Sequence, residues 1–244
     1  MKKGIAASKG YAIGKVFLQE HEEIVISDAK ITDIGAEKEK MQKALDDSKT
    51  QLEAIKVKAA AEMGAEKAEV FEAHITLLDD PEFTGAMMTE IENNSVNGLK
   101  AIESVTNTFV AIFESMDNEY MRERAADIKD VSKRILSNFA GKGGDAFAIT
   151  ENNTIVVAHD LTPSDTAGLD RTKVVGFITN IGGRTSHAAI MARTLEIPAV
   201  LGLGDITTSV KNGDMIIVDG IEGNVIINPS EEVLAEYKAK KKNS

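Results

Sequence analysis

One histidine of the chain, His187, lies just past a glycine turn, at a point where a helix is expected to begin. The surrounding residues read Gly182-Gly183-Arg184-Thr185-Ser186-His187-Ala188-Ala189. The β-branched and apolar run at 174–178 is typical of a buried strand. Thr185 or Ser186 is expected to cap the helix, which places His187 in the first turn, where backbone N–H groups lack carbonyl partners. A phosphate on this imidazole would therefore meet hydrogen-bond donors and the positive end of the helix dipole.

The side chain of His187 has the chemistry of a phosphoryl acceptor. The pKa of free imidazole is about 6.5, so much of it is unprotonated at neutral pH and is nucleophilic without an auxiliary base. Ala188 and Ala189 keep the neighbouring surface small, so another protein can bring a second reactive group close to the ring. The spacing also fits a histidine that only packs beside a tight turn, since Gly-Gly turns before helices are common.

Other kinds of chemistry fit these residues less well. Ser186 and His187 are adjacent and so cannot converge as nucleophile and base, and a Gly-x-Ser-x-Gly motif is absent. The glycine turn lacks the lysine and the loop length of a nucleotide-binding P-loop. His159 is followed by Asp160, but no HExxH or comparable ligand spacing accompanies them. We therefore expect neither a metal site nor a cofactor site in this chain.

The stretch from Gly182 to Arg193, followed by residues 195–200, resembles the active-site histidine signature of the Enzyme I family. These are the phosphoenolpyruvate-protein phosphotransferases of the bacterial sugar phosphotransferase system. Related swivelling domains of pyruvate phosphate dikinase and phosphoenolpyruvate synthase usually carry cysteine where this chain has Ser186. The resemblance extends to residues 4–8, 75–80, 119–130 and 160–164, and it covers only the amino-terminal half of the family's chains.

The resemblance implies phosphoryl transfer between His187, which would carry the group on Nε2, and a histidine of the small phosphocarrier protein HPr during sugar uptake. Family members continue into a carboxy-terminal barrel that binds phosphoenolpyruvate and Mg²⁺. That domain is expected to be missing here, so this chain would perform only the HPr half-reaction and would need no Mg²⁺. Two alternatives are a swivelling domain of a dikinase-like enzyme and a module that binds HPr without chemistry.

Further site residues follow from the same resemblance. Thr166 would hydrogen-bond the ring of His187, and a partner on the other nitrogen would fix the tautomer and keep the nucleophilic lone pair available. Lys67 would reach towards the phosphohistidine. Arg184 belongs to the motif and, with Arg193, would position the loop or neutralise the helix end. The simpler roles are a helix-surface hydroxyl for Thr166 and a solvated lysine for Lys67.

Acidic residues concentrate between residues 60 and 82, where seven acids accompany one base, Lys67. A solvated helix face is the usual explanation for such a run. Here the acids alternate with more apolar residues than one buried stripe needs, so the stretch is suited to docking a partner. By the family resemblance, the HPr docking face comprises Glu66, Glu69, His74, Leu78, Asp79, Glu82, Phe83, Met116, Met121 and Arg124.

Two kinds of periodicity divide the chain. Residues 33–142 carry apolar residues at spacings of three, four or seven, which predict four helices in an antiparallel bundle, with Pro81 bending or breaking the second segment after Asp80. Residues 145–230 alternate short strands with turns. The predicted fold is an α/β phosphohistidine (swivelling) domain formed by 1–32 and 143–230, an inserted all-α four-helix-bundle subdomain at 33–142, and a truncated linker helix at 231–244. The linkers to the bundle would lie at 27–32 and 141–144.

Composition sets the remaining limits. The chain has 244 residues, of which 43% are hydrophobic and 27% charged, as is ordinary for one or two globular domains. Its net charge of −11 argues against nucleic acid and favours a basic protein as partner. No run approaches membrane-spanning length, and the first residues lack the apolar core of a signal peptide. The absence of cysteine fits a reducing compartment, so we expect a cytoplasmic protein.

Overall fold

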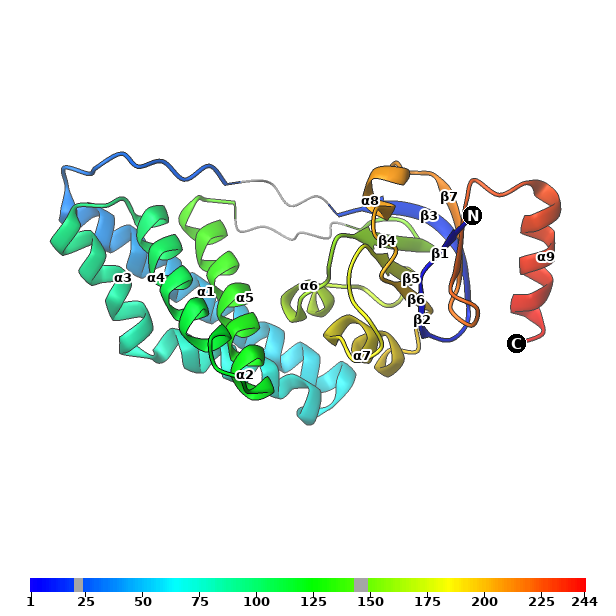
Figure 1. The fold of residues 1–244 in the computed structure, drawn as a ribbon, viewed down its shortest axis with the longest axis horizontal. Helices are drawn as coiled ribbons and strands as arrows, with labels where there is room; N and C mark the ends of the chain where they lie inside the picture. Colours follow the sequence, from blue (N-terminus) through cyan, green and yellow to red (C-terminus); the bar gives the residue numbers. More distant parts are fainter. Residues whose placement is uncertain (20–23, 143–148) are drawn as a thin grey trace. The chain divides into compact units, whose positions relative to one another are not determined.

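The computed structural model describes residues 1–19, 24–142 and 149–244. The chain forms two compact units, one made of Met1–His21 with Asp145–Ser244 and the other of Glu22–Gly144 (Figure 1). The first unit, called here the α/β unit, contains a mixed sheet with short helices. The second, called the helical unit, is built from long helices. The predicted combination of an α/β domain and an inserted helical domain is confirmed.

Five helices occur in the described part of the helical unit, instead of the predicted four. They are α1 (Ile34–Met63), α2 (Ala65–Asp79), α3 (Pro81–Asn94), α4 (Gly98–Glu114) and α5 (Glu119–Phe139). The predicted break after Asp80 is confirmed, since the Asp80 carboxylate accepts from the Glu82 N–H and Pro81 occupies the first position of α3, where no N–H is needed. Gly64 adds a further break, because its φ of 90° ends α1.

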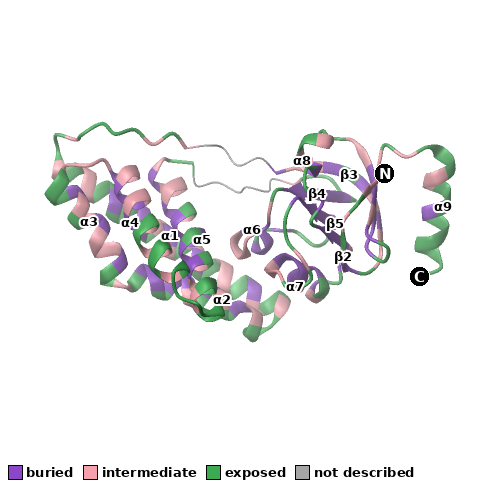
Figure 2. Ribbon diagram, viewed as in Figure 1, coloured by how far each residue is buried: buried purple, intermediate pink, exposed green. Residues whose placement is uncertain are grey.

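The helical core follows the predicted spacing along most of its length. Met41, Leu45 and Leu52 of α1 are buried, as are Phe71 and Leu77 of α2. Figure 2 shows buried positions running along the packed faces of these helices and exposed positions along their outer faces. The end of α4 is different. Ile112 and Met116 continue the apolar spacing but are 48% and 40% exposed. The apolar face is therefore exposed to solvent at this end of the helix.

The chain segment that enters the helical unit is attached to the start of α4. The Asn97 side chain donates to the carbonyl oxygens of Ser27 and Ala29, and the Ile31 N–H donates to the Ser95 carbonyl. Residues 27–32 therefore pack with the helical unit and not with the α/β unit to which residues 1–32 were assigned from the sequence. Of the expected return linker at 141–144, residues 143 and 144 lie outside the described part.

The α/β unit is organised around a mixed sheet. Its strands are β1 (Lys2–Lys3), β2 (Ile5–Ser8), β3 (Tyr11–Leu18), β4 (Thr154–Ala158), β5 (Val174–Thr179), β6 (Ala199–Leu201), β7 (Met215–Asp219) and β8 (Asn224–Ile227). Their order is β1-β8-β7-β3-β4-β5-β6-β2. The four neighbouring strands β3, β4, β5 and β6 pair in parallel, and the other pairs are antiparallel. The predicted strands at 154–158, 174–178 and 215–218 are thereby confirmed.

Gly4 lets the sheet curl until its two edges meet. Strands β1 and β2 lie at opposite ends of the sheet order, yet only Gly4 separates them in sequence. The Gly4 N–H donates to the Gly223 carbonyl, and a Cβ on Gly4 would lie 2.6 Å from the Leu201 carbonyl oxygen. Since that distance is too short for any side chain, glycine is required at this crossing.

Short helices follow three of the parallel strands, β4, β5 and β6, and one longer helix lies at the end of the described chain. They are α6 (Pro163–Ala167), α7 (His187–Thr194), α8 (Ile206–Ser209) and α9 (Glu231–Lys242). Alternate residues of the strands, among them Ile155, Val157 and Ile178, form the buried core on one face of the sheet. Helix α9 is bound to the α/β unit by Tyr237, which is buried and donates a hydrogen bond to Asp219. The stretch 231–244 is therefore part of this unit in the structure and not a separate linker. Within the described residues, no helix is both long and apolar enough to cross a membrane.

Candidate functional site

Two neighbouring parallel strands bring the candidate site together. Strand β4 is followed by α6, and the adjacent strand β5 is followed by the glycine loop and α7. Both connections leave the carboxyl ends of their strands, and in a parallel pair these ends lie at the same edge of the sheet. Thr166 of α6 and His187 of α7 consequently meet, although 21 residues separate them in sequence.

The glycine loop and its cap place His187 at the first position of α7. Gly182 has a φ of +110°, a conformation open to glycine and costly for other residues. Ser186 is the N-cap, its Oγ accepting from the Ala189 N–H at 3.4 Å and donating to the Gly183 carbonyl at 2.7 Å. The prediction that His187 begins the helix is confirmed, and of the two candidate caps it is Ser186 that is used.

The hydroxyl of Thr166 contacts Nε2 of His187. The two atoms are 3.1 Å apart, and the same hydroxyl oxygen lies 3.0 Å from the Pro163 carbonyl oxygen. Thr166 itself is only 2% exposed, whereas His187 is half-buried. The sequence prediction that Thr166 hydrogen-bonds the ring is therefore met. The expectation that it does so through the nitrogen opposite the phosphorylated one is wrong, because the contact involves Nε2 itself.

Helix α6 is short, and a capping box holds it in place. The Thr162 hydroxyl accepts from the Asp165 N–H, and the Asp165 carboxylate accepts from the Thr162 N–H. The second oxygen of Asp165 accepts from the Gln19 side-chain amide at 3.1 Å. Gln19 follows β3, so the adjacent strand also fixes α6. Sequence reasoning did not identify this support, although Thr162-Pro163-Ser164-Asp165 is a recognisable capping-box pattern.

Arg193 fastens the glycine loop to the rest of the unit. Its guanidinium donates to the Ala7 carbonyl at 2.9 Å and to the Arg184 carbonyl at 3.0 Å. This arrangement supports a positioning role for Arg193, one of the two roles expected from its place in the motif. Arg184 accepts from Arg193 through its backbone carbonyl, and Arg184 is itself exposed. The role of the Arg184 side chain in catalysis stays a prediction.

A second histidine stands at the end of β4, where Asn180 holds it. The Asn180 amide nitrogen lies 3.0 Å from Nδ1 of His159 and donates to the Thr207 hydroxyl, while the Asn180 amide oxygen accepts from the Thr207 N–H. The bond from the Thr207 N–H fixes which amide atom of Asn180 is the oxygen. The amide nitrogen therefore faces Nδ1 of His159, which accepts from it. His159 thus has a structural partner. Among the described residues, no three histidine, cysteine or acidic side chains gather as potential metal ligands.

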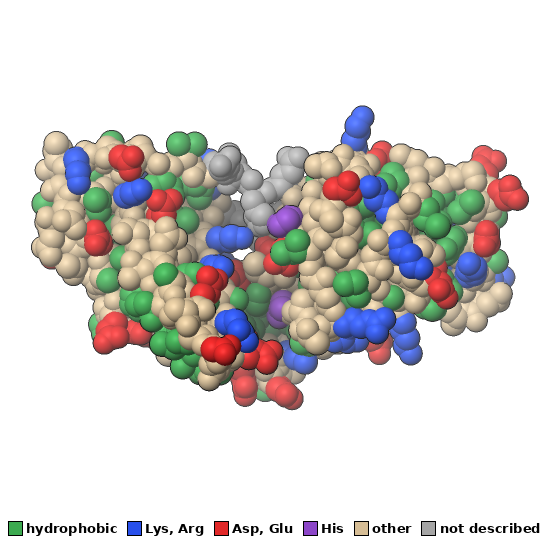
Figure 3. Space-filling view, viewed as in Figure 1, with side chains coloured by type: hydrophobic (Ala, Val, Ile, Leu, Met, Phe, Trp, Pro, Cys, Tyr) green, Lys and Arg blue, Asp and Glu red, His purple; other side chains and the backbone are tan. Residues whose placement is uncertain are grey.

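The remaining predicted site residues belong to the helical unit. Lys67 is a half-buried residue of α2. Of the expected docking face, Glu66, Glu69, Asp79, Glu82 and Met116 are exposed, and Met121 and Arg124 are half-buried. Figure 3 shows acidic, basic and hydrophobic side chains interspersed on the visible face of this unit. The roles of these residues stay predictions.

Three residues of the expected docking face are buried, which corrects the prediction for them. Leu78 and Phe83 are core side chains, and Phe83 packs edge-on against Phe109 with ring centroids 5.5 Å apart. His74 is 0% exposed, and its Nε2 lies 3.1 Å from Oδ1 of Asp127. In a helix, residues three or four positions apart share one face, and these three residues lie on the face that packs into the core of the unit. The acids beside them in sequence lie on the other face.

Two family models match the chain. The amino-terminal model of PEP-utilising enzymes matches residues 3–124, and the mobile-domain model of PEP-utilising enzymes matches residues 150–223. The second match contains both Thr166 and His187.

Curated relatives agree with these matches. The chain is 51% identical over 236 residues to the phosphoenolpyruvate-protein phosphotransferase of Listeria monocytogenes and 50% identical over 241 residues to that of Staphylococcus carnosus. The two matches include 97% and 99% of this chain. They include only 41% and 42% of the length of the two relatives.

Two solved structures match nearly the whole chain. An NMR solution structure of Enzyme I matches all of it with a TM-score of 0.87 and 47% identity, and 99% of that structure is covered. The N-terminal domain of a nitrogen-type Enzyme 1 matches 98% of the chain, and 99% of that structure, with a TM-score of 0.67 and 27% identity. The chain therefore belongs to the family of PEP-utilising enzymes and corresponds to the amino-terminal domain of Enzyme I, the phosphoenolpyruvate-protein phosphotransferase.

Proposed function

We propose that this chain exchanges a phosphoryl group between Nε2 of His187 and the active histidine of HPr, as the amino-terminal part of a phosphoenolpyruvate-protein phosphotransferase. The observation that carries the proposal is the position of His187, which begins α7 behind a glycine turn with Thr166 against its ring. In the complete enzyme, the phosphoryl group would come from phosphoenolpyruvate bound with Mg²⁺ in a carboxy-terminal domain. Sugar uptake would be the process served, and the cytoplasm the compartment.

The proposed reaction moves a phosphoryl group between two imidazoles. The Nε2 lone pair of His187 attacks phosphorus, the new N–P bond forms as the N–P bond to the HPr ring breaks, and the electron pair of the broken bond returns to the HPr nitrogen. Each ring keeps the proton on its other nitrogen, so no separate acid or base is required. Because the bonds formed and broken are of the same kind, the transfer is reversible, and positioning supplies most of the catalysis.

The ends of α7 and α6 suit this chemistry. A phosphoryl group on His187 would lie near the amino-terminal end of α7, where the helix dipole is positive and the first N–H groups have no carbonyl partners in the helix. Thr166 has one hydroxyl hydrogen, which can go either to Pro163 or to Nε2. Donation to Nε2 places the ring proton on Nδ1 and keeps the lone pair on Nε2, the arrangement that a nucleophilic Nε2 needs.

The helical unit would dock HPr. The exposed acids Glu66, Glu69 and Glu82 would steer a basic partner, and the exposed Met116 would supply apolar contact. Lys67 would add positive charge towards the phosphoryl oxygens. Electrostatic steering predicts that association slows as salt is raised. An association rate that does not change with salt would remove the steering part of the proposal.

The test is incubation of the purified chain with phosphorylated HPr, followed by intact mass and acid-lability analysis. We expect one acid-labile phosphoryl group on the wild type and none on His187→Ala. His159→Ala is the matched control, because His159 is an exposed histidine of the same unit with no proposed chemistry, and it should be labelled like the wild type. Binding of HPr without any labelling of the wild type would instead identify a docking module.

A further inference from the structure

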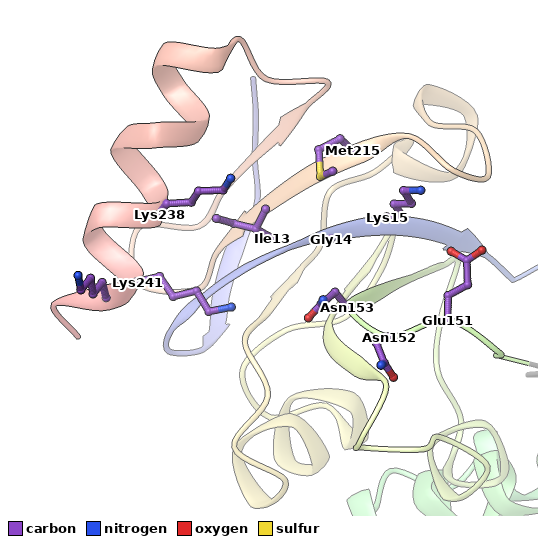
Figure 4. Close-up of a pocket in the computed structure, with 10 residues that line it drawn as sticks. Ile13, Gly14, Lys15, Glu151, Asn152, Asn153, Met215, Lys238 and Lys241 are labelled. Atoms are coloured by element: carbon purple, nitrogen blue, oxygen red, sulfur yellow. The ribbon is translucent and has the colours of Figure 1, made fainter.

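A basic groove lies in the α/β unit, formed by residues that have no part in the phosphoryl transfer proposed above. It has a volume of about 700 Å³, within the range of small-molecule sites. Its lining residues are Ile13, Gly14, Lys15, Glu151, Asn152, Asn153, Met215, Lys238, Lys241 and Lys242. Figure 4 shows lysines of α9 on one side of the groove and the turn that precedes β4 on the other.

The floor of the groove is built on a close approach of two backbone segments. The Lys15 N–H donates to the Asn153 carbonyl, and a Cβ on Gly14 would lie only 2.0 Å from that same carbonyl oxygen. Asn153 adopts a φ of +55°, which asparagine tolerates better than most residues. The half-buried side chains of Ile13 and Met215 give the floor an apolar part. The groove therefore has a fixed floor that is both apolar and amide-lined.

Four lysines line the groove without ion-pair partners among the described residues. Lys15, Lys238, Lys241 and Lys242 are all exposed, and within the described residues none of them lies in ion-pair distance of a carboxylate. Lys240 of the same helix, by contrast, pairs with Glu236 at 3.4 Å. The groove has one acid, Glu151, against four lysines, in a chain whose net charge is −11. Unpaired lysines gathered from separate segments attract anions.

We propose that this groove binds an organic polyphosphate of nucleotide size. The lysines would contact the phosphate oxygens, while the organic part of the ligand would cover Ile13 and Met215. The side chains of Asn152 and Asn153 offer donors and acceptors to the polar groups of that organic part. An inorganic anion would contact the lysines but would leave Ile13 and Met215 uncovered. Binding would be separate from the chemistry of His187, so the assignment does not depend on the proposed function.

The test is titration of the full 244-residue chain, without Mg²⁺, with ATP, inorganic tripolyphosphate and adenosine, followed by calorimetry and by backbone amide NMR. We expect ATP to bind more tightly than tripolyphosphate, and adenosine to bind weakly or not at all. The amide signals of residues 13–15, 151–153 and 238–242 should move, whereas those of residues 184–189 should not. The double variant Lys15→Gln/Lys241→Gln should weaken ATP binding by about tenfold or more, because two charge-assisted contacts are lost.

The matched control removes two exposed lysines of the helical unit, Lys58→Gln and Lys133→Gln, which changes the net charge by the same amount. ATP affinity should stay at the wild-type value in this control. Equal weakening in both double variants would mean attraction to overall charge and would overturn the site. ATP binding no tighter than tripolyphosphate would overturn the organic part of the assignment. Signal changes centred on residues 184–189 would place the anion at α7 and overturn the groove.

Discussion

The hydroxyl oxygen of Thr166 lies 3.1 Å from Nε2 of His187, the nitrogen expected to carry the phosphoryl group. The nitrogen proposed as the nucleophile is therefore already engaged in this structure. Phosphorus can bond to Nε2 only after this contact opens, through rotation of the imidazole or movement of the hydroxyl. The Thr166 hydroxyl can turn back to the Pro163 carbonyl at 3.0 Å when it releases the ring, so it keeps a partner in both states.

Replacing Thr166 by valine tests this relationship. Valine has nearly the shape of threonine but cannot hold the ring or favour the tautomer with its lone pair on Nε2. We expect transfer from phosphorylated HPr to slow by about tenfold or more, as happens when a reacting group loses its orientation. Rapid-quench labelling measures the rate. Thr194→Val is the control, since it removes a hydroxyl that bonds only the Ile190 carbonyl in the same helix, and should leave the rate unchanged.

Removal of the cap of α7 separates stability from chemistry. Ser186→Ala deletes the acceptor for the Ala189 N–H and the donor to the Gly183 carbonyl, and should lower the free energy of unfolding by about 1 kcal/mol. The transfer rate should fall as well, because the same cap fixes the turn that carries His187. Ser230→Ala removes the equivalent cap of α9. A similar loss of stability with a normal transfer rate is expected there, and a matching loss of rate would contradict the role of Ser186.

The start of α7 could be predicted from the sequence because its signals are local. A strand, a glycine turn, a cap and a histidine follow one another within residues 174–187. The nitrogen that Thr166 contacts could not be predicted in the same way, since it depends on the pairing of β4 with β5 and on the support of Asp165 by Gln19, which is 146 residues away. A contact between distant segments produces no recognisable residue spacing within either segment, so the sequence pattern does not reveal it.

The burial of His74 shows the same limit in the helical unit. Its neighbours in α2 alternate between acids and apolar residues, which is compatible with either an exposed or a buried histidine. The orientation is decided by α5, which supplies Asp127, 53 residues further along the chain. The His74 ring also packs edge-on against Phe71 of α2. Helical spacing indicated which residues of α2 lie near one another. Packing against α5 determines that His74 faces inwards.

Substitution of His74 should therefore change stability and leave docking intact. His74→Ala would leave a cavity and remove the partner of the Asp127 carboxylate, so we expect a loss of roughly 2 kcal/mol or more in the free energy of unfolding. The affinity of the folded variant for HPr should remain within about twofold of the wild type. Urea unfolding and calorimetric titration with HPr make the two measurements.

A matched pair of exposed positions gives the opposite expectation. Glu69→Gln and Met116→Ala remove groups from the exposed part of the proposed docking face, so they should weaken HPr binding with changes in stability within about 0.5 kcal/mol. The charge change at Glu69 should act mainly on the association rate. If His74→Ala abolished HPr binding while the unfolding free energy stayed at the wild-type value, the assignment of His74 to the core would be contradicted.

The attachment of α9 should depend on alkaline pH through Tyr237. Burial raises the pKa of the Tyr237 phenol above its ordinary value of 10.0, and the hydrogen bond to Asp219 and the charge of that carboxylate raise it further. The folded state thus favours the protonated phenol. Its stabilising contribution is complete below the unfolded pKa of 10.0 and is lost as pH rises through the higher folded pKa. Above that point, a phenolate would face the Asp219 carboxylate, and α9 should loosen from the sheet.

Amide hydrogen exchange in α9, corrected for the intrinsic pH dependence of exchange, measures this attachment between about pH 9 and about pH 12. Wild-type protection should fall across this range. Tyr237→Phe keeps the ring against Tyr11 but lacks the hydroxyl, so its protection should be lower by about 1 kcal/mol at neutral pH and should not depend on this titration. Tyr120→Phe is the control, because that residue is 62% exposed and lies in the helical unit. A wild-type protection profile that stays flat to the highest pH would mean that packing against Tyr11 holds α9 without the phenol hydrogen bond.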